Sequence, residues 1–463
     1  MEDLAEAALD AALEKGASFA DIRVESSVGT KIELTGGVTK KCQSSRIKGA
    51  GIRAFIDGSW GFTTTSSLKA TDLKKAGETA ARIAMILKNH ATEKFSIVAP
   101  TYEAKVPFRA KQPLVETSVE EKVQFVQVID KQARAVDDRI INTRTVYNDF
   151  FSTLYIANTL GTAVWIEHSL PRIYCRATAK ECGKSRDSHE SAGFRGGFER
   201  IKDEGREIGT RAAKLAIEQL SATTVKGKLY DVILDPKLNG TLVHESFGHA
   251  CEADNFRAGS SILIGKNGQQ LGIEELNILD DPTLPNLRGS FDYDWEGTRT
   301  RKKTLIEKGI LGEMDNKLHS LETASFFKIK PNGSARAESF LHHPIPRMSN
   351  TFMKPGSWNV DELISDMREG LILCDTNYGY TNSAKGQFMF QASYGYLIEN
   401  GEKGKPLTGV SVSGMLLDVL MKIDGIASDF DMMSGTCGKD GQEVEDYSGG
   451  PHIRVRNMPV GGM

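Results

Sequence analysis

Two histidines and a glutamate fall within seven residues of this chain, and their spacing sets a strict condition on the backbone. Residues 243–249 read Val-His-Glu-Ser-Phe-Gly-His, so His244 and His249 are five positions apart. At about 100° per residue, a regular α-helix would place the two rings roughly 140° apart, too far to share one ligand. Joint binding therefore requires a π-type bulge, or a helix that ends near Gly248 with the second histidine on its exit.

The residue types in this stretch are the parts of a zinc hydrolase. Soft imidazole nitrogens can hold the metal, and the carboxylate of Glu245 can take a proton from water. The pattern H-E-x-x-x-H is one residue longer than the H-E-x-x-H of familiar zinc peptidases. Because zinc usually takes at least three protein ligands, another must come from elsewhere, and a thiolate would suit. Cys251 is expected on a different face of the helix, whereas Cys437 lies in a glycine-rich segment that we predict to be a loop.

Each of these residues also has an ordinary structural interpretation. The two histidines can be core or surface side chains that happen to be close, and Cys437 can be incidental in its glycine-rich segment. Glu252 and Asp254 can orient the imidazoles as hydrogen-bond acceptors, or they can be solvated carboxylates at a helix end. The residues alone leave these alternatives open.

Composition and charge exclude several other classes of protein. The chain has 463 residues with a net charge of −3, which gives no support for a surface that binds nucleic acid or an anionic membrane. Its six cysteines are dispersed, without a C-x-x-C pair, as is typical of a reduced protein. No apolar run approaches the roughly 20 residues that span a bilayer, and the acidic N-terminus is unlike a signal peptide. The sequence therefore predicts a soluble, cytoplasmic protein.

The order of predicted elements indicates an α+β protein with two domains. Helices are expected at residues 1–16, 71–88, 118–136 and 203–220, and strands at residues 20–25, 31–34, 51–62 and 139–179. This order predicts an N-terminal α+β domain, residues 1–222, whose helices pack on an antiparallel sheet. The C-terminal domain, residues 223–463, is expected to be β-rich and barrel-like and to carry the metal-site helix.

Several blocks of the sequence together resemble one known family. Residues 244–254, His-Glu-Ser-Phe-Gly-His-Ala-Cys-Glu-Ala-Asp, look like the H-E-x-x-x-H signature of the TldD side of the TldD/PmbA family. Residues 435–442, Gly-Thr-Cys-Gly-Lys-Asp-Gly-Gln, are similar to its C-terminal cysteine segment. Further agreement lies in residues 335–340, 344–351 and 398–401 and, more loosely, in residues 51–62.

The resemblance implies a zinc-dependent peptidase that cleaves unfolded or short peptides. Zinc would be held by His244, His249 and Cys437, with Glu245 acting on the water that the metal activates. A homodimer, or a heterodimer with a PmbA-type paralogue that lacks the histidine motif, is also implied. One departure concerns residues 443–447, Glu-Val-Glu-Asp-Tyr, where a more apolar Val-Pro-Val-like run is expected.

Two other functions compete with a peptidase. One is a non-catalytic interaction protein, because this family has also been described as modulators of DNA gyrase. Such a protein would not need the metal motif. A zinc amidase that acts on a non-peptide bond would use the same metal and base, so only its substrates would distinguish it.

Overall fold

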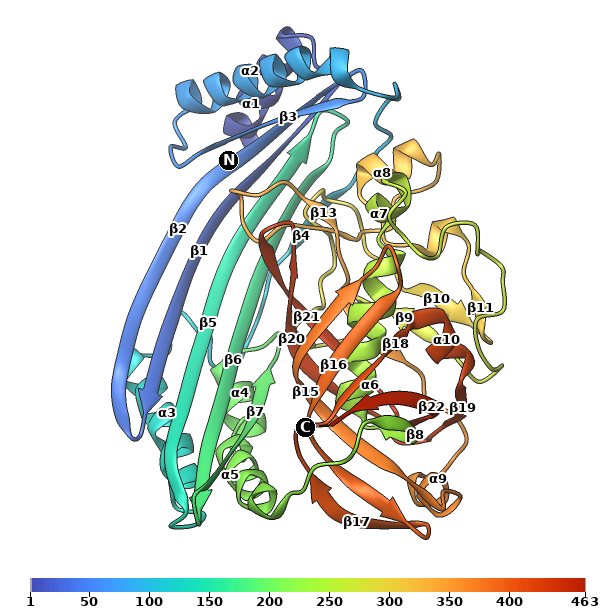
Figure 1. Cartoon of the computed structure of the whole chain (residues 1–463). Helices are drawn as coiled ribbons and strands as arrows, with labels where there is room; N and C mark the ends of the chain where they lie inside the picture. Colours follow the sequence, from blue (N-terminus) through green and yellow to red (C-terminus); the bar gives the residue numbers. More distant parts are fainter. Residues whose placement is uncertain (1, 463) are drawn as a thin grey trace.

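The chain folds into a long curved sheet that lies alongside a β-rich C-terminal part (Figure 1). The structure is a computed structural model that describes residues 2–462. Helices and strands mix as the sequence predicts for an α+β protein. Within residues 2–462, no helix combines the length and the apolar character that crossing a membrane requires.

The curved sheet is built from strands much longer than the sequence patterns predict. Its order is β3-β2-β1-β5-β6-β4, and β7 pairs with β6 beside that path. The two short strands expected at residues 20–25 and 31–34 are one continuous strand of 17 residues, because polar residues between them still pair with both neighbours. The strands are β1 (Phe19–Thr35), β2 (Val38–Ile56), β3 (Ser59–Thr65), β4 (Glu103–Val106), β5 (Ile140–Asn158), β6 (Ala163–Glu181) and β7 (Lys184–Gly193).

Helices pack against both ends of this sheet. Helices α1 and α2 lie at the end near β3, and helices α3, α4 and α5 lie at the opposite end (Figure 1). The helices are α1 (Glu2–Glu14), α2 (Ala70–Leu87), α3 (Val119–Arg134), α4 (Phe198–Glu204) and α5 (Ile208–Glu218). The Ser118 side chain accepts a hydrogen bond from the Glu121 amide and so caps α3 at the start of the helix expected over residues 118–136. The helix expected at 203–220 is present as α5, but it begins only at Ile208, because a separate helix, α4, ends at Glu204 with Gly205 after it.

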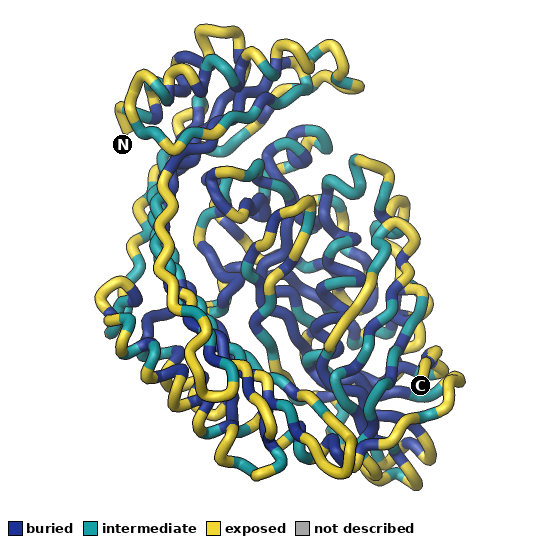
Figure 2. Tube along the Cα trace, turned by 60° about the vertical axis from the view of Figure 1, so that its left-hand side comes forward, coloured by how far each residue is buried: buried dark blue, intermediate teal, exposed yellow. Residues whose placement is uncertain are grey.

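The C-terminal part contains a closed barrel of five strands. Strands β15, β8, β22, β18 and β16 follow one another, and β16 pairs back with β15 to close the ring. The barrel and its flanking strands are β8 (Lys228–Leu234), β15 (Glu369–Asn382), β16 (Gln387–Glu399), β17 (Glu402–Leu407), β18 (Ser411–Met415), β19 (Ile423–Ile426) and β22 (Ile453–Gly461). Apolar side chains from these strands, together with others from the segment after β8 and from the neighbouring sheet, form the largest hydrophobic cluster of the described chain, and Figure 2 shows the trace mostly buried here.

A second, mixed sheet lies beside the barrel and has the order β11-β10-β9-β14-β21-β20. Its strands are β9 (Ile278–Asp280), β10 (Lys303–Glu307), β11 (Ile310–Leu311), β14 (Asn350–Met353), β20 (Asp431–Lys439) and β21 (Gln442–Gly450). The remaining elements of this part are β12 (Ala335–Arg336), β13 (Ile345–Pro346), α6 (Pro236–Thr241), α7 (Ala253–Arg257), α8 (Leu321–Phe326), α9 (Val360–Ser365) and α10 (Leu416–Met421). A domain boundary at 222/223, between α5 and β8, stays a prediction.

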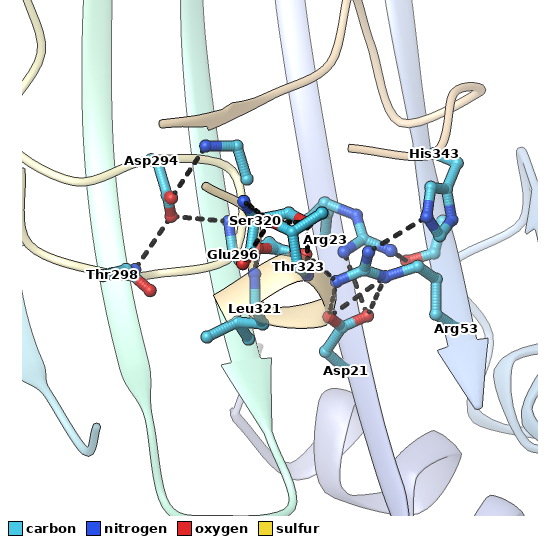
Figure 3. A network of polar contacts seen from close by, with 12 residues as sticks. Asp21, Arg23, Arg53, Asp294, Glu296, Thr298, Ser320, Leu321, Thr323 and His343 are labelled. Atoms are coloured by element: carbon cyan, nitrogen blue, oxygen red, sulfur yellow. Dashed lines mark hydrogen bonds and ion pairs between the residues drawn. The ribbon is translucent and has the colours of Figure 1, made fainter. Parts of the chain in front are cut away.

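A buried network of charges ties the long sheet to the C-terminal part (Figure 3). Asp21 on β1 pairs with Arg23, at 3.0 Å, and with Arg53 on β2. Arg53 also reaches across to the C-terminal part, where its Nη2 lies 2.7 Å from Glu296 Oε1. The second oxygen of Glu296 accepts a hydrogen bond of 2.6 Å from the Leu321 amide at the start of α8. All four charged side chains are fully buried, so each depends on the others for its charge balance.

Removing one member of this network should destabilise the protein strongly. In Asp21→Ala the buried guanidinium groups of Arg23 and Arg53 are left with Glu296 as their only carboxylate, so one buried positive charge is no longer balanced. We therefore expect the free energy of unfolding to fall by about 3–5 kcal/mol. Equilibrium urea unfolding measures the difference. The matched control is Asp187→Ala, which removes an exposed ion pair with Arg176 and should leave the free energy almost unchanged. Equal effects of the two substitutions would contradict a structural role for the network.

Candidate metal centre

The histidine motif follows directly from the first strand of the barrel. After β8, the Asp235 side chain accepts a hydrogen bond of 2.8 Å from the Leu238 amide and starts α6, with Pro236 in its first turn. Gly240 lets α6 lie directly against β21, since a Cβ atom there would meet the Gly449 amide nitrogen at 2.6 Å. This close packing brings the end of the helix next to the hairpin of β20 and β21.

The helix widens where the two histidines lie. Residues Leu242–Gly248 form a π-helix, and His249–Cys251 form a 3-10 turn at its exit. The π-type distortion predicted from the five-residue spacing is thus confirmed, and the helix also ends at Gly248. As a result the imidazoles of His244 and His249 lie side by side, with ring centroids 5.5 Å apart and planes at 88°.

Cys437 completes a cluster with these two rings. One ligand atom from each of His244, His249 and Cys437 lies within 4.8 Å of the others, and the Cys437 Sγ is 3.4 Å from His249 Nε2. The prediction that Cys437 lies in a loop is wrong: it is on strand β20, opposite Val444 of β21, and only the turn at Asp440 and Gly441 is irregular. Strand geometry points its side chain to the face where the helix lies. Cys251 is packed in the hydrophobic core instead.

The free donor atoms of this cluster fit a metal ion. Both ring nitrogens of His244 are buried without a hydrogen-bond partner, which is costly for an imidazole unless something else binds them. Two imidazoles and a thiolate are a donor set that suits zinc and leaves a coordination position open for water.

The electrostatics of the cluster favour a thiolate. Burial alone would raise the pKa of Cys437, but the charges of His244 and His249 hold it well below its usual range. Burial alone would lower the pKa of His244, yet the charges of Asp446 and Cys437 raise it to about 9. A thiolate is the form of cysteine that binds a metal.

A charged pair supports the second histidine from behind. Glu252, fully buried, accepts a 2.9 Å hydrogen bond through Oε2 from the His249 Nδ1, and Lys439 Nζ lies 3.0 Å from the same oxygen. Lys439 lies two residues after Cys437 on β20, so this contact joins the cysteine strand to the histidine segment. Asp254 lies 2.6 Å from Lys439 and makes no hydrogen bond to either imidazole within the described residues. Of the two acceptors weighed from the sequence, Glu252 is the one that contacts an imidazole.

Asp446 was not singled out by the sequence, although it belongs to the run that departs from the family pattern. It lies on β21 opposite Gly435, and its Oδ2 is 3.4 Å from His244 Nδ1. Burial raises the pKa of Asp446 to about 6, an effect that the neighbouring His244 opposes. The signal in the sequence that could have identified Asp446 is that it is an acidic residue in a run expected to be apolar.

Glu245 lies beside the cluster but faces outward. Its side chain is 41% exposed, and its Oε2 is 3.8 Å from His249 Nε2. The three clustered donors are by contrast buried or nearly so. A carboxylate in this position can exchange protons with a water molecule at the open side of the cluster.

The helix exit has no room for a side chain at position 248. A Cβ atom on Gly248 would lie 2.0 Å from the Sδ of the buried Met348, so Gly248→Ala should shift the His249 turn and weaken zinc binding about ten-fold. The matched control is Gly438→Ala beside Cys437, where an added Cβ meets nothing within 4 Å. Chelator competition measures both affinities, and unchanged binding by Gly248→Ala would contradict the requirement for glycine.

Comparison with known proteins agrees with the resemblance read from the sequence. Family models described as PmbA/TldA metallopeptidase domain 1, central domain and C-terminal domain match residues 20–84, 112–220 and 226–462. A protein from Methanothermobacter thermautotrophicus named Metalloprotease is 35% identical over 452 residues, with 97% of each chain covered. One from Saccharolobus solfataricus named Zinc metalloprotease TldD homolog is 30% identical over 458 residues, covering 97% of this chain and 98% of its own.

Solved structures share the fold over the whole length. A crystal structure from Thermotoga maritima, described as that of a modulator of a DNA gyrase, has a TM-score of 0.81 at 24% identity and covers 99% of both chains. TldE from Thermococcus kodakarensis also has a TM-score of 0.81, at 18% identity, with 99% of this chain covered. Since the family models span most of the sequence and the relatives match nearly end to end, the chain belongs to the PmbA/TldD family.

Proposed function

We propose that this protein is a zinc-dependent peptidase whose metal ligands are His244, His249 and Cys437. The observation that carries the proposal is the convergence of these three donors on one point, with the Nε2 of His244 buried and without a hydrogen-bond partner. Names of relatives such as Metalloprotease and Zinc metalloprotease TldD homolog support the same reading.

The roles of the protein groups follow from their positions. When bound, zinc would supply Lewis acidity to a water molecule and to the scissile carbonyl. Glu245, at the exposed side of the cluster, would accept the proton of the attacking water and then pass it to the leaving amine. Glu252 and Lys439 would hold the His249 ring in orientation from behind.

The substrate and assembly proposals rest on the family resemblance. We propose that the substrate is an unfolded or short peptide, and that the protein acts in the cytoplasm as a homodimer or with a PmbA-type paralogue. The six cysteines, all free, are consistent with a reducing compartment. Light scattering on the purified protein, alone and with a paralogue, measures the assembly.

Removal and return of the metal test the proposed function. The purified protein should contain about one zinc ion per chain, and should cleave a quenched fluorescent peptide that has no stable structure. Treatment with 1,10-phenanthroline followed by dialysis should abolish cleavage, and one equivalent of Zn²⁺ should restore it. Cleavage that persists after complete metal removal would overturn the proposal, as would a zinc-loaded protein that hydrolyses no peptide in a diverse library.

A further inference from the structure

Asp446 is an unusual residue to find in the interior beside a metal centre. Its side chain is only 5% exposed, and its Oδ1 has no hydrogen-bond partner within the described chain. Burying a carboxylate without compensation costs several kcal/mol, so a group that balances it is expected nearby. The nearest such group is His244, whose Nδ1 lies 3.4 Å from Asp446 Oδ2.

Each of the two histidines has a carboxylate on the Nδ1 side of its ring. Glu252 Oε2 makes a 2.9 Å hydrogen bond with the Nδ1 of His249, whereas Asp446 Oδ2 lies 3.4 Å from the Nδ1 of His244 without forming a hydrogen bond in this structure. A carboxylate that accepts the Nδ1–H of an imidazole fixes the tautomer and leaves Nε2 as the nitrogen that can bind a metal. The Nε2 of His249 does face the Cys437 Sγ, at 3.4 Å.

The charges of the centre give Asp446 a second role. A divalent ion held by two neutral imidazoles and one thiolate retains one unbalanced positive charge in a buried place. Glu252 cannot balance it, because Lys439 already lies 3.0 Å from its carboxylate. Asp446 accepts no hydrogen bond at its Oδ1, and the cations that act on its charge are His244 and, less strongly, Arg288, neither of which is bonded to that oxygen.

We propose that Asp446 is a positioning residue that accepts the Nδ1–H of His244 and balances the charge of the bound zinc ion. This inference rests on the proposed function, since it assumes that His244 is a ligand. The residue lies within the run 443–447, where the family resemblance leads us to expect apolar residues. It makes the centre more strongly metal-binding than the two histidines and the cysteine would be without it.

Zinc affinity of Asp446 variants tests this role without reference to activity. In competition with a chromogenic chelator, Asp446→Val, which removes both acceptor and charge, should bind Zn²⁺ about 10- to 100-fold more weakly than the unaltered protein. Asp446→Asn keeps an acceptor but no charge, so its affinity should lie in between. Glu443→Gln, on the same strand but exposed, is the matched control and should bind as the unaltered protein does.

A spectroscopic signature separates positioning from general damage. In zinc-loaded protein labelled with ¹⁵N-histidine, the Nδ1–H proton of His244 should be protected from exchange, and Asp446→Val should lose that protection. If Asp446→Val does not fold, the zinc affinity of Asp446→Asn is compared with that of the unaltered protein instead. Unchanged affinity in the folded Asp446 variants, or an equal loss in Glu443→Gln, would overturn the inference alone. Failure of the unaltered protein to bind zinc would overturn the proposed function together with it.

Discussion

Glu245→Gln is expected to lower peptide hydrolysis by about 10²–10⁴-fold while zinc remains bound, because general acid–base catalysis contributes a factor of this size. The amide keeps the shape of the side chain but cannot accept the proton of the attacking water. The side chain is 41% exposed and belongs to no buried network, so the fold should not change. The rate of cleavage of a fluorescent peptide, measured beside the zinc content, separates loss of the base from loss of the metal.

The matched control for this variant is Glu307→Gln, an exposed glutamate on β10. It should cleave the peptide at the unaltered rate. A Glu245→Gln protein that retains full activity with zinc bound would contradict the role of Glu245 as the base, although the metal centre itself would stand.

Cys437→Ala should remove the metal and, with it, all activity above background. Two imidazoles without the thiolate leave fewer protein ligands than zinc sites usually have. The matched control is Cys251→Ala, another buried cysteine close to the motif in sequence but packed in the hydrophobic core. It should keep its zinc. Elemental analysis of the two purified variants measures the difference.

The opposite pattern, with zinc lost in Cys251→Ala and kept in Cys437→Ala, would mean that the wrong thiol has been assigned. Zinc content unchanged in both variants would remove the thiolate from the centre altogether.

The helix distortion was predictable from the sequence because it is a matter of angular geometry. His244 and His249 are five positions apart, which excludes binding of one metal ion by both on a regular α-helix, and the structure has a π-helix over Leu242–Gly248. The third donor was not predictable in this way. Cys437 lies almost two hundred residues downstream, and residue patterns carry no information on such a distant contact. Helix geometry disfavoured Cys251, but only the family resemblance pointed to Cys437 as the ligand.

Long-range packing explains the features that the sequence did not show. Cys437 belongs to a strand, since β20 pairs with β21 over its whole length despite its glycines. Strand β1 continues through polar residues because its neighbours β2 and β5 bond to both of its edges. The buried position of Asp446 likewise depends on how β21 lies against the histidine segment. Local propensity says little about any of these contacts.

X-ray absorption at the zinc K-edge of the purified protein tests the convergence of the three donors most directly. The first coordination shell should contain one sulfur and two imidazole nitrogens, and the sulfur should be absent from the spectrum of any metal retained by Cys437→Ser. A zinc shell of the unaltered protein made only of nitrogen and oxygen would contradict the account.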